Sequence, residues 1–346
     1  MHRCVFPLLV LLAFPLNAHH PSREARGTVQ GTVRDAATGA PLENTNVYLS
    51  STTLGTATDS AGRFMLGNIP PGAYQLVASR VGYRVGSKSV VIGEGGAVRA
   101  DMRIEAVELK GEEVEVLARV DTEWRRMLGE FLNAFIGEGE NAGACVLLNP
   151  EVLDFREDAN SGRLTASTDS VLRIENRALG YRLYARLGIF DWSVQEEQGR
   201  YLLYPRFEAL TPRDSTEQSA WTERRARCYL GSLKHFLASL VAGKDEEEHF
   251  VIRTGTLTEL QTGRSHPLAP EDIRIEQVPR QRFWKVAFDS WLRVDFRREE
   301  ERRRSYIRLA GQPAVVDGAG NLVNPFSLEV IGDWTKSRVA DMLPIQ

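Results

Sequence analysis

The strongest constraint on the fold is a period-two alternation of apolar residues across residues 27–104. In this segment apolar side chains occupy every second position in short runs, and glycine, proline or aspartate separates one run from the next. Alternation of this kind buries one face of a strand, and several such strands at close spacing favour a β-sandwich. The alternating runs are residues 29–33, 47–49, 64–66, 74–76 and 98–104.

The turns between these runs have the residues that tight turns require. Asp59 can accept main-chain hydrogen bonds at the start of a turn, and Gly62 is free to adopt a positive φ. Pro71 and Gly72 suit the two central positions of a type II turn. Residues 27–105 are therefore expected to fold as one sandwich domain.

An ordered series of residues in this segment also carries a family resemblance. The series is Gly31, Asp35, Thr38-Gly39, Pro41-Leu42, Val47, Asp59, Gly62, Phe64, Pro71-Gly72, Tyr74 and Gly82-Tyr83. With this series, residues 27–105 resemble the carboxypeptidase-regulatory-like domain, a seven-stranded prealbumin-like sandwich. That family appends the module to metallocarboxypeptidases and, in bacteria, to the periplasmic end of TonB-dependent outer-membrane receptors. The resemblance implies a fold and an envelope setting, but not peptidase activity, because the module is not the catalytic part of those enzymes.

The first eighteen residues have the pattern of a secretory signal peptide. His2 and Arg3 precede an apolar run over residues 5–16, and Ala18 provides a small residue at the cut. The run is too short to span a bilayer, which needs about 20 apolar residues. Cys4 lies too early in the chain for a lipoprotein cleavage site. We therefore expect cleavage after Ala18 and an exported protein, periplasmic or outer-membrane-associated, that does not span the membrane.

The rest of the chain is expected to be a connector, residues 106–120, and an α+β domain of unknown function, residues 121–346. Asp121 or Thr122 can cap a helix that ends at Gly137, and a second helix is expected over residues 220–242. Outside these helices, one strand-like segment follows another along the chain, which favours a mostly antiparallel sheet. The expected strands are residues 171–174, 182–192, 201–207, 250–261, 283–288, 291–296, 305–309 and 314–316.

A second resemblance covers this region. Its motifs resemble those of uncharacterised bacterial envelope proteins that also contain a carboxypeptidase-regulatory-like domain. It implies an architecture and brings no catalytic residues. The motifs are Asn149-Pro150-Glu151-Val152-Leu153, Ile174-Glu175-Asn176, Leu179-Gly180-Tyr181, residues 231–237, Gly332-Asp333-Trp334 and residues 340–344.

A search for catalytic, cofactor or metal motifs finds none that we would assign. No histidine has a glutamate three residues later, as a zinc carboxypeptidase requires, and neither a Gly-x-Ser-x-Gly elbow nor a Walker lysine motif is present. Gly137-Glu138-Gly139 follows a helix rather than a strand, so it is interpreted as a helix-ending loop. Ser232 and His235 share one helical face, but a lone helical histidine is more often packed than catalytic.

Charge excludes one class of partner and leaves others open. The formal net charge is −3, so the chain has no general electrostatic affinity for nucleic acid. The glutamate run at residues 246–248 and the arginine runs at residues 297–298 and 302–304 are interpreted as solvated loops or strand edges.

The cysteines suggest one possible disulfide. If Cys4 leaves with the signal peptide, Cys145 and Cys228 remain in an exported chain, and an oxidising compartment favours their pairing. The alternative is that Cys145 is simply a small buried apolar residue.

These observations lead to a first hypothesis on function. We expect a non-enzymatic exported envelope protein, a binding or assembly module that needs no cofactor and whose partner is an envelope protein, a peptide or a carbohydrate. One alternative is an uncharacterised hydrolase with a catalytic C-terminal domain and the sandwich as its accessory. Another is a periplasmic partner of TonB-dependent uptake, which rests on fold analogy alone.

Overall fold

The computed structural model describes residues 26–107, 122–264, 266–269, 271–279 and 282–345. The expected signal peptide, residues 1–18, and most of the expected connector, residues 106–120, lie outside the described residues. Of the connector, Ala106 pairs with Tyr83 and the Val107 N–H donates to the Gly82 oxygen.

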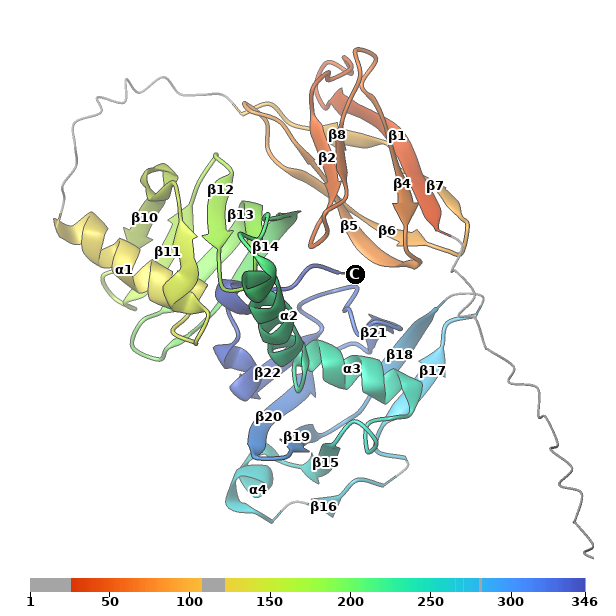
Figure 1. Ribbon diagram of the computed structural model, residues 1–346, viewed down its shortest axis with the longest axis vertical. Helices are drawn as coiled ribbons and strands as arrows, with labels where there is room; N and C mark the ends of the chain where they lie inside the picture. The colour runs from red at the N-terminus through yellow and green to blue at the C-terminus, as the bar shows by residue number, and fades with distance from the viewer. Residues whose placement is uncertain (1–25, 108–121, 265, 270, 280–281, 346) are drawn as a thin grey trace, which may run out of the picture.

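The first eight strands form two sheets that enclose one core, as the alternation predicts (Figure 1). One sheet has the order β4-β1-β7, with β8 also paired to β1, and the other has the order β3-β2-β5-β6. The alternating apolar residues meet between the sheets, where Val29, Val33 and Leu76 are fully buried. The strands are β1 (Gly27–Asp35), β2 (Asn46–Leu49), β3 (Gly55–Ala57), β4 (Arg63–Ile69), β5 (Gly72–Ser79), β6 (Gly86–Ile92), β7 (Ala97–Arg99) and β8 (Met102–Ile104).

The expected count of seven strands is not confirmed, because the last expected run is divided into β7 and β8. Both pieces run parallel to β1, β7 beside residues 28–30 and β8 beside residues 33–35. Between them the Asp101 carboxylate accepts hydrogen bonds from the Thr32 N–H and hydroxyl. The Asp101 side chain thus takes the place of one main-chain hydrogen bond between β1 and the strand beside it.

The next part of the chain packs a helix on a six-stranded sheet. Helix α1 (Thr122–Ile136) begins and ends where the sequence predicts, with Gly137 at φ +94° after it. Its buried Phe131 and Phe135 contact Phe190 of the longest strand. The sheet order is β10-β11-β13-β12-β9, with β14 beside β13, and all its pairings are antiparallel. Its strands are β9 (Cys145–Leu147), β10 (Asp154–Glu157), β11 (Arg163–Ser167), β12 (Leu172–Asn176), β13 (Tyr181–Ser193) and β14 (Gln198–Ala209).

The last part has its own core, formed by a five-stranded and a three-stranded sheet around helix α3 (Leu233–Ala242). Phe236 and Leu237 of α3 pack on Phe250, Phe296 and their neighbours. The five-stranded sheet has the order β16-β15-β19-β20-β22, and the smaller one β17-β18-β21. Their strands are β15 (Phe250–Gly255), β16 (His266–Pro267), β17 (Arg274–Gln277), β18 (Phe283–Ala287), β19 (Trp291–Arg298), β20 (Glu301–Leu309), β21 (Ala314–Asp317) and β22 (Leu328–Gly332). The α+β, mostly antiparallel character expected for residues 121–346 is therefore present, but in two cores.

Two element predictions in this region are wrong. The single helix expected over residues 220–242 is two helices, α2 (Ser215–Tyr229) and α3, because Gly231 adopts φ +67° and the Ser232 hydroxyl caps α3. The strand expected over residues 250–261 ends at Gly255. Helix α4 (Leu257–Thr262) follows, and a reciprocal capping box between Thr256 and Glu259 starts it.

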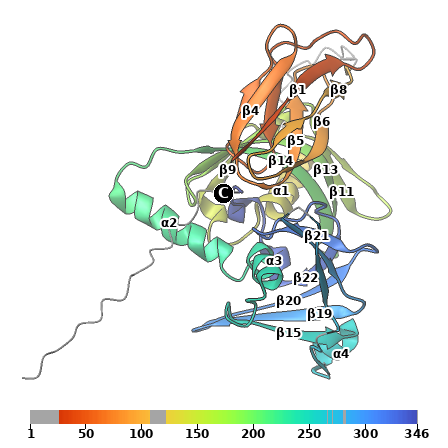
Figure 2. The same ribbon diagram turned by 90° about the vertical axis from the view of Figure 1, so that its right-hand side faces the viewer.

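The sandwich docks on the rest of the molecule through main-chain hydrogen bonds (Figure 2). The Ser51 N–H donates to the Pro205 oxygen of β14, and the Phe207 N–H donates to the Thr52 oxygen. The C-terminal segment joins the same contact, since the Ile345 N–H donates to the Ser51 oxygen. Ile345 also packs against the sandwich core. In the part of the chain that the structure describes, no helix is long and apolar enough to cross a membrane.

Candidate functional site

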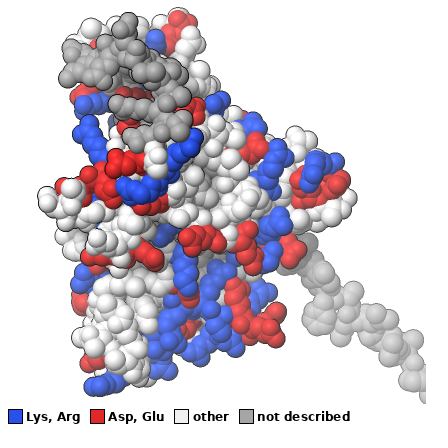
Figure 3. All heavy atoms as spheres, turned by 90° about the vertical axis from the view of Figure 1, so that its left-hand side faces the viewer, with Lys and Arg blue, Asp and Glu red and all other residues white. Residues whose placement is uncertain are grey.

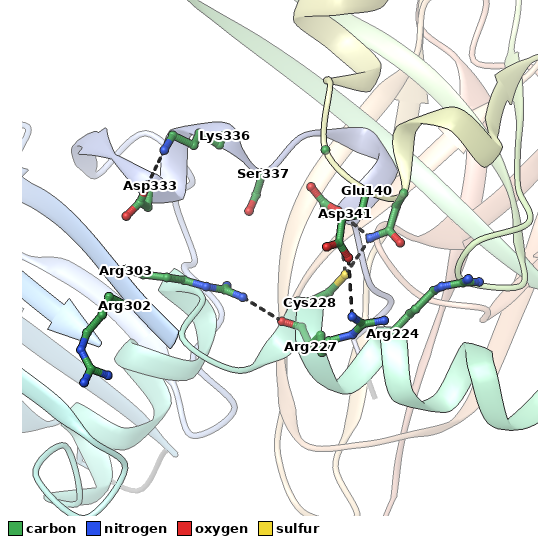
Figure 4. Close-up of a pocket in the computed structure, with 12 residues that line it drawn as sticks. Glu140, Arg224, Arg227, Cys228, Arg302, Arg303, Asp333, Lys336, Ser337 and Asp341 are labelled. Atoms are coloured by element: carbon green, nitrogen blue, oxygen red, sulfur yellow. Dashed lines mark hydrogen bonds and ion pairs between the residues drawn. The ribbon is translucent and has the colours of Figure 1, made fainter. Parts of the chain in front are cut away.

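A cavity of about 290 Å³ lies where α2, the start of β20 and the C-terminal segment meet the loop that follows α1 (Figure 4). We call it the arginine cleft. Its volume is at the lower end of the range for small-molecule sites, so it suits one small polar group. Its lining residues are Gly139, Glu140, Asn141, Arg224, Arg227, Cys228, Arg302, Arg303, Asp333, Lys336, Ser337 and Asp341.

Helix α2 brings Arg224, Arg227 and Cys228 to the cleft. The Asp214 carboxylate caps the helix by accepting from the Glu217 N–H. Trp221 is buried against the turn at Gly180 and donates its indole N–H to the Arg177 oxygen at 2.8 Å. This contact sets the position of α2, and with it the arginines of its last turns.

The opposite wall is held by a polar contact between segments that are far apart in sequence. The Asn141 amide donates to the Asp341 carboxylate at 2.8 Å and lies 3.2 Å from the Cys228 sulfur. Short 3₁₀ turns at Asp333–Lys336 and Val339–Asp341 place the remaining C-terminal residues. The cleft is therefore assembled only in the folded chain.

Cationic side chains outnumber carboxylates in the cleft. Arg303 reaches from β20 toward α2 and donates to the Arg227 main-chain oxygen at 3.3 Å, as Figure 4 shows. Arg302 donates to the main-chain oxygens of Glu299 and Glu301. Four arginines and one lysine thus line the cavity with Glu140, Asp333 and Asp341, although the Arg302 side chain points away from the carboxylates in Figure 4.

The carboxylates of the cleft leave part of this positive charge uncompensated. Arg227 and Glu140 are 3.6 Å apart and mostly exposed, and such surface pairs contribute at most about 1 kcal/mol. Burial raises the pKa of Asp333, but hydrogen bonds from Lys336 and the Arg304 N–H outweigh it and leave the pKa below its ordinary value. Asp333 is therefore ionised and occupied by its own partners. Arg227 is paired with Glu140 and Glu223, and Arg303 with Glu301, in partly exposed pairs that an added anion would displace.

The disulfide expected between Cys145 and Cys228 is absent from the structure, where both thiols are free. Burial, with the nearby Asp341 carboxylate, raises the pKa of Cys145 to about 12 and that of Cys228 to about 11. Both thiols are thus protonated at neutral pH.

A thiol titration of the unfolded, unreduced protein tests this pair directly. With Cys4 removed, we expect two free thiols for each chain, because neither Cys145 nor Cys228 is bonded to another sulfur in the structure. A fully reduced sample is the control for the total count. Finding no free thiol would instead support the pairing that the sequence suggests.

Ser232 and His235 have structural partners at the start of α3. The Ser232 hydroxyl accepts from the His235 N–H as the helix cap. The buried His235 ring accepts from the Gly231 N–H through Nδ1, which leaves its proton on Nε2, 3.2 Å from Glu248. Both side chains therefore fix the break between α2 and α3.

His235 makes stability depend on pH. Burial lowers its pKa below the ordinary value of 6.5, against an opposing effect of Glu248. The folded protein therefore favours the neutral ring. This stabilisation is complete above pH 6.5 and is lost as the pH falls below it.

We expect denaturant unfolding between pH 7 and pH 5 to show a smaller loss of stability for His235→Asn than for the wild type. His266→Asn, at an exposed site, is the matched control. Equal pH slopes in all three proteins would contradict this assignment.

Only part of the cleft has a signal in the sequence, and the meeting of Arg227 with Arg303 has none. The loop at Gly137-Glu138-Gly139 is confirmed as a helix end, yet it also supplies part of the cleft wall. Of the arginine run at residues 302–304, Arg302 and Arg304 are solvated as expected, whereas Arg303 reaches toward α2 at the cavity. No three His, Cys, Asp or Glu side chains within the described ranges are grouped so that they could hold a metal ion.

Comparison with known families confirms the resemblance of the N-terminal segment. Residues 28–105 match the model of the carboxypeptidase regulatory-like domain. This segment coincides with the eight-stranded sandwich and excludes the arginine cleft. No curated protein matches the chain.

Solved structures match weakly. The minor pilin GBS52 of Streptococcus agalactiae is 18% identical over 24% of this chain, with a TM-score of 0.21, and the match covers 46% of the pilin. A 5-hydroxyisourate hydrolase of Klebsiella pneumoniae is 22% identical over 22% of this chain and 90% of its own, with a TM-score of 0.18. A putative carbohydrate binding protein of Bacteroides uniformis is 6% identical over 88% of this chain and 98% of its own, with a TM-score of 0.19. These scores establish no shared overall fold.

Proposed function

We propose that this protein is a non-enzymatic binding module of the bacterial envelope that holds an anionic group of its ligand in the arginine cleft. The observation that supports this is that Arg227 of α2 and Arg303 of β20 meet at one small cavity, which Arg224, Arg302 and Lys336 also line. Arginine forms bidentate, charge-assisted hydrogen bonds with carboxylates and phosphates. The carboxypeptidase regulatory-like domain at residues 28–105 is then an accessory module beside the binding site.

The chemistry of the cleft favours binding over catalysis. Cys228 places a thiol, a potential nucleophile, in the wall of the cavity. Its pKa is raised to about 11, which keeps that thiol protonated. Asp341 is held by the Asn141 amide, and Asp333 by Lys336. The envelope location rests on the expected signal peptide and on the setting that the family resemblance implies.

Isothermal titration with inorganic phosphate and, separately, with galacturonate tests the proposal. We expect at least one of these anions to bind the full-length protein. We also expect Arg227→Ala/Arg303→Ala to weaken that binding at least about tenfold, since each lost charge-assisted hydrogen bond removes roughly 1.5–3 kcal/mol. Arg63→Ala/Arg99→Ala, which removes two exposed, ion-paired arginines of the sandwich, is the control and should bind like the wild type. No detectable binding of either anion, or equal affinity in the cleft variant, would refute the proposal.

A further inference from the structure

A second cationic feature lies next to the cleft, on the outer face of the five-stranded sheet. Residues two apart on a strand share a face. Strand register then places six arginines on this face, with the carboxylates of Asp295 and Glu329. Figure 3 looks onto this side of the molecule, where Lys and Arg side chains gather in the lower half. The six arginines are Arg253, Arg293, Arg297, Arg302, Arg304 and Arg308.

Three of these arginines form a line along β20, which we call the arginine stripe: Arg302, Arg304 and Arg308. All three are exposed. A strand advances about 3.4 Å per residue, so the stripe extends for about 20 Å. Arg302 also lines the arginine cleft, so the stripe begins where the cleft opens.

One ion pair of the stripe, between Arg308 and Glu329, is of a kind that a ligand can displace. Arg304 contacts Asp295 at 2.6 Å and Arg308 contacts Glu329 at 2.6 Å, with about half of each arginine side chain exposed. The Arg308–Glu329 pair is about half exposed on both sides and contributes at most about 1 kcal/mol, so an added anion can compete for Arg308. The Asp295 carboxylate that holds Arg304 is only 4% exposed, so that pair is the firmer of the two. Asp295 keeps Arg293 and Arg297 as partners when Arg304 turns to a ligand.

We propose that the arginine stripe extends the cleft into a binding site for a linear acidic polysaccharide. This inference rests on the proposed function, because one anionic group of the polymer occupies the cleft and later groups contact β20. Trp291 lies beside the stripe, with the Arg308 guanidinium 5.0 Å from its ring centre. Its half-buried ring offers a sugar an apolar surface between charged contacts.

The surroundings of the stripe favour this polymer over other polyanions. Glu299 and Glu300 lie in the turn before β20, and Glu329 lies beside Arg308, so an extended anionic membrane surface would meet carboxylates as well as arginines. A nucleic acid carries denser charge, and the chain as a whole has a net charge of −3. A narrow cationic line with an aromatic neighbour suits a chain of sugar rings with spaced carboxylates.

The test measures binding of fluorescently labelled polygalacturonate to the full-length protein by anisotropy. We expect Arg302→Ala/Arg308→Ala to weaken binding at least about tenfold. Arg84→Ala/Arg99→Ala, with two exposed arginines of the sandwich, should leave it unchanged. Unchanged affinity in the stripe variant would overturn the inference. So would polyphosphate, single-stranded DNA or phosphatidylglycerol vesicles that bind as tightly as polygalacturonate.

A single variant separates this inference from the proposed function. Arg308→Gln leaves every residue of the cleft intact, so binding of inorganic phosphate or galacturonate should stay at the wild-type level while polygalacturonate binds more weakly. If binding of the small anions requires Arg227 and Arg303 but Arg308→Gln binds polygalacturonate as tightly as the wild type, the cleft proposal is supported and the stripe proposal is refuted. If Arg308→Gln weakens polymer binding although Arg227→Ala/Arg303→Ala has no effect on the small anions, the cleft proposal fails, and this inference fails with it.

Discussion

Gly180→Ala is expected to lower the free energy of unfolding by about 2–5 kcal/mol. Gly180 adopts φ +69°, and a Cβ at this position would lie 2.3 Å from ring atoms of Trp221. A left-handed conformation costs a non-glycine residue roughly 1–2 kcal/mol, and overpacking a core adds about 1–3 kcal/mol. Chemical denaturation of the purified variant measures the loss. Because Trp221 positions α2, the same change should also weaken anion binding in the cleft.

Gly243→Ala is the matched control for that variant. Gly243 adopts φ +65° at the end of α3, and a Cβ there meets no atom within 4 Å. The Gly243→Ala variant should lose only the free energy that the left-handed conformation costs a non-glycine residue, about 1–2 kcal/mol. Equal losses at the two glycines would mean that the contact between Gly180 and Trp221 does not constrain α2.

Phe131→Ala is expected to cost about 3–5 kcal/mol, since the change leaves a cavity in the core between α1 and its sheet. Phe131 is fully buried, with ring centres of Phe135 and Phe190 each 4.7 Å away. Phe326→Ala, at a side chain that is 43% exposed, should cost less than about 1 kcal/mol in the same denaturation experiment. A similar small loss at Phe131 would contradict the core described for this part of the chain.

The sandwich could be predicted from the sequence because its signals are local. Strand alternation and turn residues such as Asp59 and Gly62 act within a few positions of one another. The same holds for α1, whose apolar spacing and final Gly137 define both its face and its end. The type II turn expected at Pro71 and Gly72 is wrong, because Gly72 begins β5 and does not have a positive φ.

Other local signals were present but were outweighed by the apolar pattern. Ser232 is a helix cap, and with Gly231 it divides one apparently continuous helix into α2 and α3. Thr256 and Glu259 have the spacing of a capping box, yet the apolar residues around them favoured a longer strand. Caps therefore identify the ends of elements that periodicity alone merges.

The cleft could not be predicted, because its walls are distant in sequence. Asn141 and Asp341 are 200 residues apart, and Arg227 and Arg303 are brought together only by packing of α2 beside β20. The arginine run at residues 302–304 looks the same in the sequence whether it is solvated or lines a cavity. Strand register decides this, since alternate residues of β20 point to opposite faces.

The most direct test of the binding proposal is nuclear magnetic resonance of the arginine side chains during a titration with galacturonate. The Nε–H signals are assigned by single Arg→Lys variants. We predict that the signals of Arg227 and Arg303, which line the cleft, shift with one common dissociation constant. The signals of Arg63 and Arg99 on the sandwich should not move. Unmoved Arg227 and Arg303 signals, or equal shifts at all four arginines, would contradict a specific anion site in the cleft.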